Sequence, residues 1–190
     1  MHSNAVIFRI PDWLQAQRPD TPTPDAAARM AWVIELSRRN VDLGTGGPFA
    51  AALFNMETHA PVATGVNLVT SSGLSIAHAE IVAISMAQQT LGTFDLSRAG
   101  RFELVSSCEP CAMCFGALPW SGIRALTCGA RDRDAREIGF DEGPRHPQWI
   151  DELERRGIAV QTELCREAAR GVLQRYAAAE GTIYNGGRGQ

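Results

Sequence analysis

Residues 102–130 read FELVSSCEPCAMCFGALPWSGIRALTCGA. Hydrophobic patterning and the flanking turn residues predict a strand over Phe102–Ser106, a helix over Pro110–Leu118 and a second strand over Ile123–Cys128. Strands that alternate with helices are typical of a mixed, mostly parallel sheet with helices on both faces. This stretch therefore predicts an α/β fold.

The rest of the chain extends this pattern in both directions. Two extended runs, Phe49–Asn55 and Pro61–Val69, are separated by a short polar connection and predict an antiparallel hairpin. With a last strand at Ile158–Thr162, they complete a mixed five-stranded sheet that starts with the hairpin, in a three-layer α/β/α fold. The remaining helices are predicted over Asp25–Asn40, Ala77–Leu91, Arg131–Glu137 and Arg166–Ala179.

Length and composition fit one folded domain. The chain has 190 residues, of which 45% are hydrophobic and 21% charged, close to the averages of globular proteins. We expect an N-terminal arm at residues 1–24, a compact domain at 25–180 and a C-terminal tail at 181–190.

The charged residues exclude several classes of function, and the cysteines indicate the cellular compartment. All 18 basic residues are arginine, and a chain without lysine has neither a P-loop lysine nor a Schiff-base lysine. A net charge of −3 supplies no general attraction for nucleic acid. The five cysteines and the lack of a long apolar run predict a cytoplasmic protein without a membrane span.

Two fragments, each at the start of a predicted helix, carry candidate metal ligands. Cys111 and Cys114 lie three residues apart, so they share a helix face, and the helix N-terminus favours their thiolate forms. His78 would supply a third ligand. Three protein ligands leave the fourth tetrahedral position to water, which is the arrangement of a catalytic zinc site.

Glu80 follows His78 by two residues and is the candidate catalytic group. A carboxylate near the metal can take a proton from water and deliver it to a substrate. Two alternatives remain open. Cys108 could complete a closed structural site, although its position before Pro110 predicts that it points elsewhere. In the second alternative, zinc only stabilises the fold and the protein has a binding role. A purely structural zinc site would not need the Glu80 carboxylate beside it.

The combination of H-x-E with P-C-x-x-C resembles the cytidine deaminase superfamily of zinc-dependent nucleobase deaminases. The resemblance covers the chain from about Asp25 to about Ala179. It implies a cytidine deaminase-like fold, a Zn²⁺ cofactor and hydrolytic removal of an amino group from a ring such as cytosine, cytidine, guanine or adenosine in tRNA, among which the signature alone does not choose.

Flanking residues are similar to those of the bacterial guanine deaminases within this superfamily. The resemblance implies that Phe49 stacks on the base, that Asn67 binds the base edge and that Trp120 forms a pocket wall. From the segment IGFDEGP at 138–144 it implies Phe140 as a pocket residue and Glu142 as a second carboxylate.

Guanine is the substrate that best explains a second carboxylate. Its N1 and its 2-amino group present adjacent N–H donors that Glu142 can bind while protons move. The expected reaction converts guanine to xanthine and ammonia. The tail sequence GTIY at 181–184 resembles the segment that guanine deaminases exchange between subunits, which implies a homodimer and a capping role for Tyr184.

Other substrates stay open at this point. A related ring, such as guanosine, ammeline or cytosine, would use the same metal site. A tRNA adenosine deaminase should carry a basic surface or tail, whereas the tail here has only Arg188 as a basic residue. A free base therefore fits better than a nucleic acid.

Overall fold

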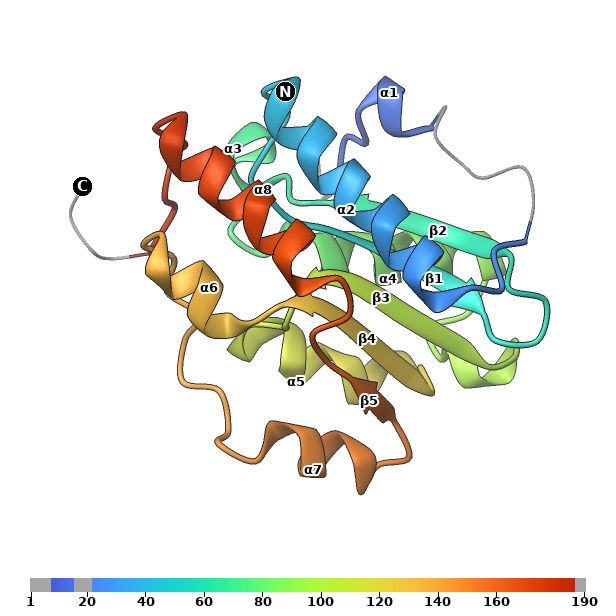
Figure 1. Cartoon of the computed structure of the whole chain (residues 1–190). Helices are drawn as coiled ribbons and strands as arrows, with labels where there is room; N and C mark the ends of the chain where they lie inside the picture. Colours follow the sequence, from blue (N-terminus) through green and yellow to red (C-terminus); the bar gives the residue numbers. More distant parts are fainter. Residues whose placement is uncertain (1–7, 16–21, 187–190) are drawn as a thin grey trace, which may run out of the picture.

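A mixed five-stranded sheet lies between two layers of helices in the computed structural model, which describes residues 8–15 and 22–186 (Figure 1). The strand order is β2-β1-β3-β4-β5. The strands are β1 (Ala50–Asn55), β2 (Pro61–Val66), β3 (Phe102–Cys108), β4 (Ala125–Ala130) and β5 (Ala159–Gln161).

The pairing confirms the predicted hairpin and the α/β class but corrects the balance of directions. β1 runs antiparallel to both β2 and β3, while β3–β4 and β4–β5 are parallel, so the sheet is not mostly parallel. The reason is the crossover that follows β2. The connection from β2 to β3 contains a helix, and β3 pairs with β1 on the side opposite to β2. β2 and β3 therefore run in the same direction, and β1 lies between them, antiparallel to both.

Helices cover both faces of the sheet, each over its own hydrophobic core. On one face α2 (Ala26–Asp42) and α8 (Arg166–Ala178) lie side by side (Figure 1). On the other face lie α4 (Ala79–Leu91) and α5 (Ala112–Ser121). Within the described residues, no helix is long and apolar enough to cross a membrane. The shorter helices are α1 (Asp12–Gln15), α3 (Val69–Ser72), the 3₁₀ helix η1 (Leu96–Arg98), α6 (Asp132–Glu137) and α7 (Trp149–Glu154).

Helix α4 approaches the sheet closely because a glycine of β2 faces its first turn. A Cβ placed on Gly65 would lie 2.3 Å from the Ala79 carbonyl oxygen and 2.5 Å from the Ala83 nitrogen. Any side chain there would force the helix backbone away from the strand. Gly65 therefore fixes where the N-terminus of α4 lies.

Several predicted boundaries were wrong for identifiable reasons. β2 ends at Val66 rather than Val69, because the Asn67 side chain accepts a hydrogen bond from the Val69 N–H (3.1 Å) and turns the chain into α3. Helix α7 was not predicted. Of the predicted arm, residues 1–7 and 16–21 lie outside the described residues, and Leu14 of α1 is buried in the core. The last tail residues, 187–190, also lie outside them.

An ion pair between α6 and α8 makes the stability of the fold depend on pH. The buried Asp134 carboxylate accepts hydrogen bonds from Arg166 Nε (2.9 Å) and Nη2 (2.7 Å), and Arg166 lowers the pKa of Asp134 from 3.8 to about 2. A carboxyl whose pKa is lowered by folding stabilises the fold above its unfolded pKa, and this contribution is lost as the pH falls through the folded value.

Asp134→Asn is therefore expected to lower the Tm near neutral pH, and its difference from the wild type should shrink between pH values of about 4 and about 2. Thermal unfolding across this range measures the effect. Glu137→Gln is the control, because its half-exposed side chain makes only a surface pair with Arg170. A Tm difference that stays constant with pH would contradict the assignment.

Candidate metal centre and active site

The N-termini of α4 and α5 meet beside the carboxyl end of β3 and bring three candidate ligands together. One ligand atom each from His78, Cys111 and Cys114 lies within 4.8 Å of the other two. His78 Nδ1 and Cys111 Sγ are 3.5 Å apart. The convergence that the two sequence fragments predict is thus present in the fold.

Two of these residues occupy the N-cap position of their helix. His78 precedes α4 and Cys111 precedes α5, each with an extended backbone. Cys111 Sγ also accepts a hydrogen bond from the Cys114 backbone N–H (3.5 Å). The predicted helix start at Ala77 was two residues early, because His78 caps the helix instead of continuing it.

The donor set and its electrostatics fit zinc. A hydrogen bond from Cys114, together with the nearby His78, lowers the pKa of Cys111 to about 4. The same bond and burial raise the pKa of the Cys114 thiol. Burial is the largest single influence and opposes the charge on His78, but the hydrogen bond with Cys111 and the negative charges on Cys111, Glu80 and Glu142 together outweigh it and raise the pKa of His78. One imidazole and two thiolates are ligands that zinc prefers in a tetrahedral site.

Glu80 lies beside this group without belonging to it. Its carboxyl accepts hydrogen bonds from Cys114 Sγ (3.5 Å) and from Ser106 Oγ (3.4 Å), and the residue is 6% exposed. Burial, and then the charge on Cys111, raise the pKa of Glu80. A buried carboxyl at this position can hold a proton next to the metal and transfer it.

Cys108 does not join the ligand group within the described part of the chain. Its thiol donates to the Arg131 carbonyl oxygen (3.6 Å), and burial raises its pKa well above the ordinary value. The geometry agrees with the expectation that Cys108 points elsewhere.

A second buried carboxyl, Glu142, faces the same pocket. Burial raises its pKa to about 8, with further contributions from the charges on Cys111 and Glu80. The Ala112 N–H donates to the Glu142 carbonyl oxygen (2.9 Å), which fastens the loop of Glu142 to the first turn of α5.

Three aromatic side chains close the pocket around these carboxyls. The Phe140 ring lies 5.1 Å from the Phe49 ring and 4.9 Å from the Tyr184 ring, measured between centroids. The family resemblance implies that these three residues stack on the base, line the pocket and cap it. They offer an apolar lining that suits a flat heterocycle.

Asn67 lines the pocket with its amide oriented by the backbone. Its Oδ1 already accepts from the Val69 N–H, while its buried Nδ2 has no hydrogen-bond partner among the described residues. A buried donor without a partner is costly unless a ligand satisfies it. Asn67 therefore presents a donor to whatever enters the pocket.

The C-terminal tail caps the pocket of its own chain. The buried Tyr184 hydroxyl approaches Gly47 so closely that a Cβ there would lie 2.4 Å from it. Asn185 accepts from the Asp141 N–H and donates to the Gly139 carbonyl oxygen, each at 2.9 Å. This latch was missed, because nothing in the sequence NGG marks a contact with residues more than 40 positions away. Exchange of the tail between subunits stays a prediction.

Trp120 lies apart from the pocket of its own chain. It lies in the last turn of α5, 85% exposed, and is not among the residues that line the pocket of this chain. The cysteines at the start of α5 point toward the metal centre, whereas the helix carries Trp120 to its opposite end. Trp120 therefore does not line the pocket of its own chain, and its role as a pocket wall stays a prediction.

Comparisons with known proteins agree with this geometry. The family model described as the cytidine and deoxycytidylate deaminase zinc-binding region matches residues 25–130. The guanine deaminase of Bacillus subtilis is 40% identical over 109 residues, which are 57% of this chain and 67% of that protein.

Solved structures extend the similarity over nearly the whole chain. The guanine deaminase from Nitrosomonas europaea is 46% identical, with a TM-score of 0.89, and the match covers 94% of this chain and 99% of that one. A structure in complex with 2,6-diaminopurine is 48% identical, with a TM-score of 0.90, over 96% and 97% of the two chains. The chain therefore belongs to the family that carries the cytidine and deoxycytidylate deaminase zinc-binding region, and within it to the guanine deaminases.

Proposed function

We propose that this zinc-dependent aminohydrolase converts guanine to xanthine and ammonia. The observation that carries the proposal is that Glu80 and Glu142 bury their carboxyls in one pocket with His78 and Cys111, which form a ligand group with Cys114. A binding protein with a structural zinc would have no need to bury two carboxyls there, because burial of an ionisable group without function is costly.

His78, Cys111 and Cys114 would hold the zinc ion, which lowers the pKa of water and supplies a nucleophile near neutral pH. Glu80 holds the proton that this water gives up. As the C2–O bond forms and the C2–N2 bond of guanine breaks, Glu80 delivers that proton to the departing amine. The buried position of Glu80 shields the proton from bulk water.

Asn67 and Glu142 would orient the base. The free Nδ2 donor of Asn67 matches an acceptor on the purine edge, and Glu142 matches the N–H donors at N1 and the 2-amino group. A carboxyl with a pKa of about 8 can accept and return a proton near neutral pH. The complex of the similar protein with 2,6-diaminopurine supports a purine base as the ligand class.

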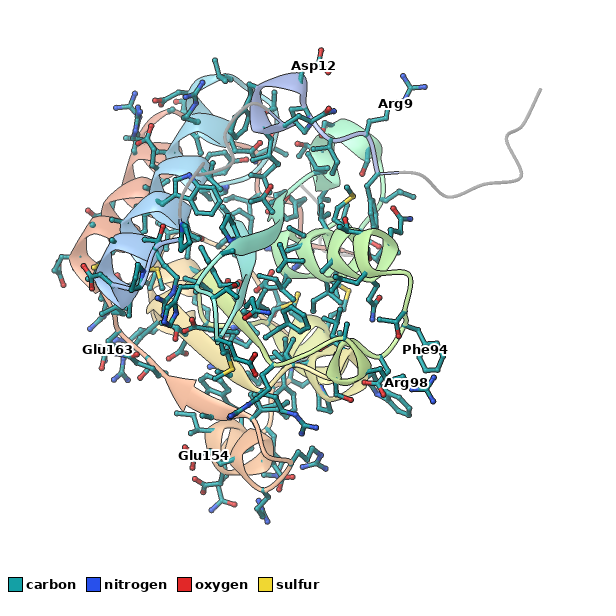
Figure 2. All side chains as sticks on the ribbon, turned by 90° about the vertical axis from the view of Figure 1, so that its right-hand side faces the viewer. Arg9, Asp12, Phe94, Arg98, Glu154 and Glu163 are labelled. Carbon is teal, nitrogen blue, oxygen red and sulfur yellow. The ribbon has the colours of Figure 1, made fainter. Side chains whose placement is uncertain are left out.

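A free base is favoured over tRNA by the distribution of charge. Most arginines of the described residues are paired with carboxylates, as in Arg38–Asp42 and Arg166–Asp134. Figure 2 shows Arg9 and Arg98 pointing outward at separate places on the surface. Phosphate recognition needs a cluster of unpaired cations.

Ammonia release from a panel of guanine, guanosine, cytosine, cytidine, adenosine and ammeline tests the substrate. We expect the highest kcat/KM for guanine, with xanthine as the product. A zinc-loaded protein that makes no xanthine from guanine would refute the proposal, and turnover of another base would replace guanine in it.

A second copy of the chain is the expected partner, in a homodimer. Helix α5 contains no charged residue, yet its outer face is open, with Met113 37% and Trp120 85% exposed. A helix that is apolar on all sides is normally covered by other parts of a protein. Trp120→Glu is therefore expected to convert a dimer into a monomer, as measured by sedimentation. A dimer that persists in this variant would contradict the proposed interface.

The tail is proposed to exclude water from the pocket during turnover. Truncation after Ala179 removes Tyr184 and the Asn185 latch, and it should lower kcat/KM for guanine at least about 10-fold, since excluding water strengthens every electrostatic contact in the site. Truncation after Gly186 is the matched control and should leave turnover unchanged. Equal kinetics of the two truncated proteins would count against the capping role.

A reducing compartment, the cytoplasm, is the proposed location. All five cysteines are free thiols, and two of them are candidate ligands that oxidation would destroy.

A further inference from the structure

The loop that carries Glu142 is fastened to the metal-binding turn on both sides of Cys111. On one side, the Ala112 N–H donates to the Glu142 carbonyl oxygen (2.9 Å). On the other side, Arg145 Nη1 donates to the Pro110 carbonyl oxygen (2.9 Å). The neighbours of Cys111 in the sequence, 110 and 112, are thus both bonded to residues 142–145.

Arg145 is itself held from two further directions. Its Nη2 donates to Glu109 Oε2 (2.9 Å), and its guanidinium lies 4.4 Å from the centroid of the Trp149 ring. Glu109 Oε2 also accepts from the Asp132 N–H (3.2 Å). The side chains of Arg145 and Glu109 are only 11% and 8% exposed. Charges this buried are retained only in a well-bonded geometry, because removal of one partner leaves the other uncompensated.

Close packing of the backbone leaves the loop little freedom elsewhere. Gly143 has a φ of 69°, and a Cβ there would lie 3.1 Å from the Ala112 Cβ. Another side chain that holds the loop, Arg136, donates to the Gly143 carbonyl oxygen (3.0 Å) but is 42% exposed. An exposed contact contributes less than the buried Arg145–Glu109 pair.

We infer that Arg145, oriented by Glu109, is a positioning residue for the reaction. It sets the distance between the Glu142 carboxyl and the metal ligand Cys111. This inference rests on the proposed function, in which Glu142 binds the base while the metal acts on it. A displacement of about 1 Å between two such groups can lower the rate about 100-fold.

The planar guanidinium is needed because two acceptors, the Pro110 carbonyl and the Glu109 carboxylate, lie side by side. Lysine would keep the charge but cannot present two fixed parallel donors. Arg145→Lys should therefore recover only part of the kcat that Arg145→Gln loses, and Arg145→Gln should lower kcat between about 10-fold and 100-fold with zinc content unchanged.

A double-mutant comparison separates positioning from general stability. If Arg145 acts through Glu142, adding Arg145→Gln to Glu142→Gln should lower kcat by less than about threefold further, because residues that act as a unit are not additive. Full multiplication of the two single effects would overturn the inference. Arg155→Gln, at a side chain that is 62% exposed, is the control and should leave kcat unchanged.

A crystal structure of Arg145→Gln gives a second readout that does not depend on the substrate. Residues 142–145 should move away from Pro110 and Ala112, and an unchanged loop would overturn the inference. If the loop moves but the wild-type protein makes no xanthine, the proposed substrate fails while the positioning role stands. Glu109→Gln should reproduce the displacement if Arg145→Gln folds poorly.

Discussion

Glu80→Gln is expected to lower kcat for guanine deamination about 1,000-fold while zinc content and Tm stay near their wild-type values. Glutamine keeps the shape of the side chain and an oxygen that can accept from Ser106 Oγ. It cannot hold or deliver a proton. Because burial already raises the pKa of Glu80, replacing the carboxyl with a neutral amide should cost the fold little.

Steady-state kinetics, metal analysis and thermal unfolding of the same preparation test this expectation. Glu57→Gln, in the turn between β1 and β2, is the control and should change none of the three quantities. A parallel loss of zinc and of Tm in Glu80→Gln would favour a structural metal site, in which Glu80 only supports the ligands.

Cys114→Ser is expected to abolish both zinc retention and turnover. Cys114 is fully buried, its thiol lies next to Cys111 and Glu80, and serine is a much weaker zinc ligand than a thiolate. Two remaining ligands would leave the ion bound too weakly to survive dialysis. Since metal binding also contributes to folding, the Tm should fall as well.

Cys108→Ser supplies the matched control, because it makes the same chemical change at another buried thiol, at the end of β3. The Cys108 thiol bonds to the Arg131 carbonyl oxygen, so this variant should keep its zinc and most of its kcat. Loss of zinc from Cys108→Ser would show that the ligand set contains four side chains, and a closed site would not support hydrolysis.

Local signals explain most of what the sequence could predict about the fold. Residue patterns with periods of 2 and 3.6 identified all five strands and the helices α2, α4, α5, α6 and α8. The direction of β1 relative to β3 depends on a crossover that no local pattern reveals. Helix α7 was missed because it has only 6 residues, and its two buried residues, Trp149 and Leu153, give too short a pattern to indicate a helix.

The candidate site likewise has one part that local sequence patterns predict and another part that only the folded structure reveals. Spacing at the start of a helix was enough to predict that Cys111 and Cys114 lie in one candidate metal site. The partners of Arg145 lie 35 and 36 positions away, and the contacts of Asn185 are more distant still, so only the folded chain reveals them. Trp120 does not line the pocket of its own chain because it lies at the end of α5 opposite the cysteines, and the motif alone does not reveal this.

The contact between Gly65 and the first turn of α4 has a consequence for how this enzyme can change. Gly65 has no side chain, so the first turn of α4 packs directly on the outer strand β2. This contact sets the distance of His78 and Glu80 from the sheet. Residues that line the pocket can be replaced to fit other substrate rings without changing the contact between Gly65 and α4. Changes at the rim of the pocket therefore leave the distance between the Glu80 carboxyl and the sheet unaltered, because Gly65, which fixes it, does not line the pocket.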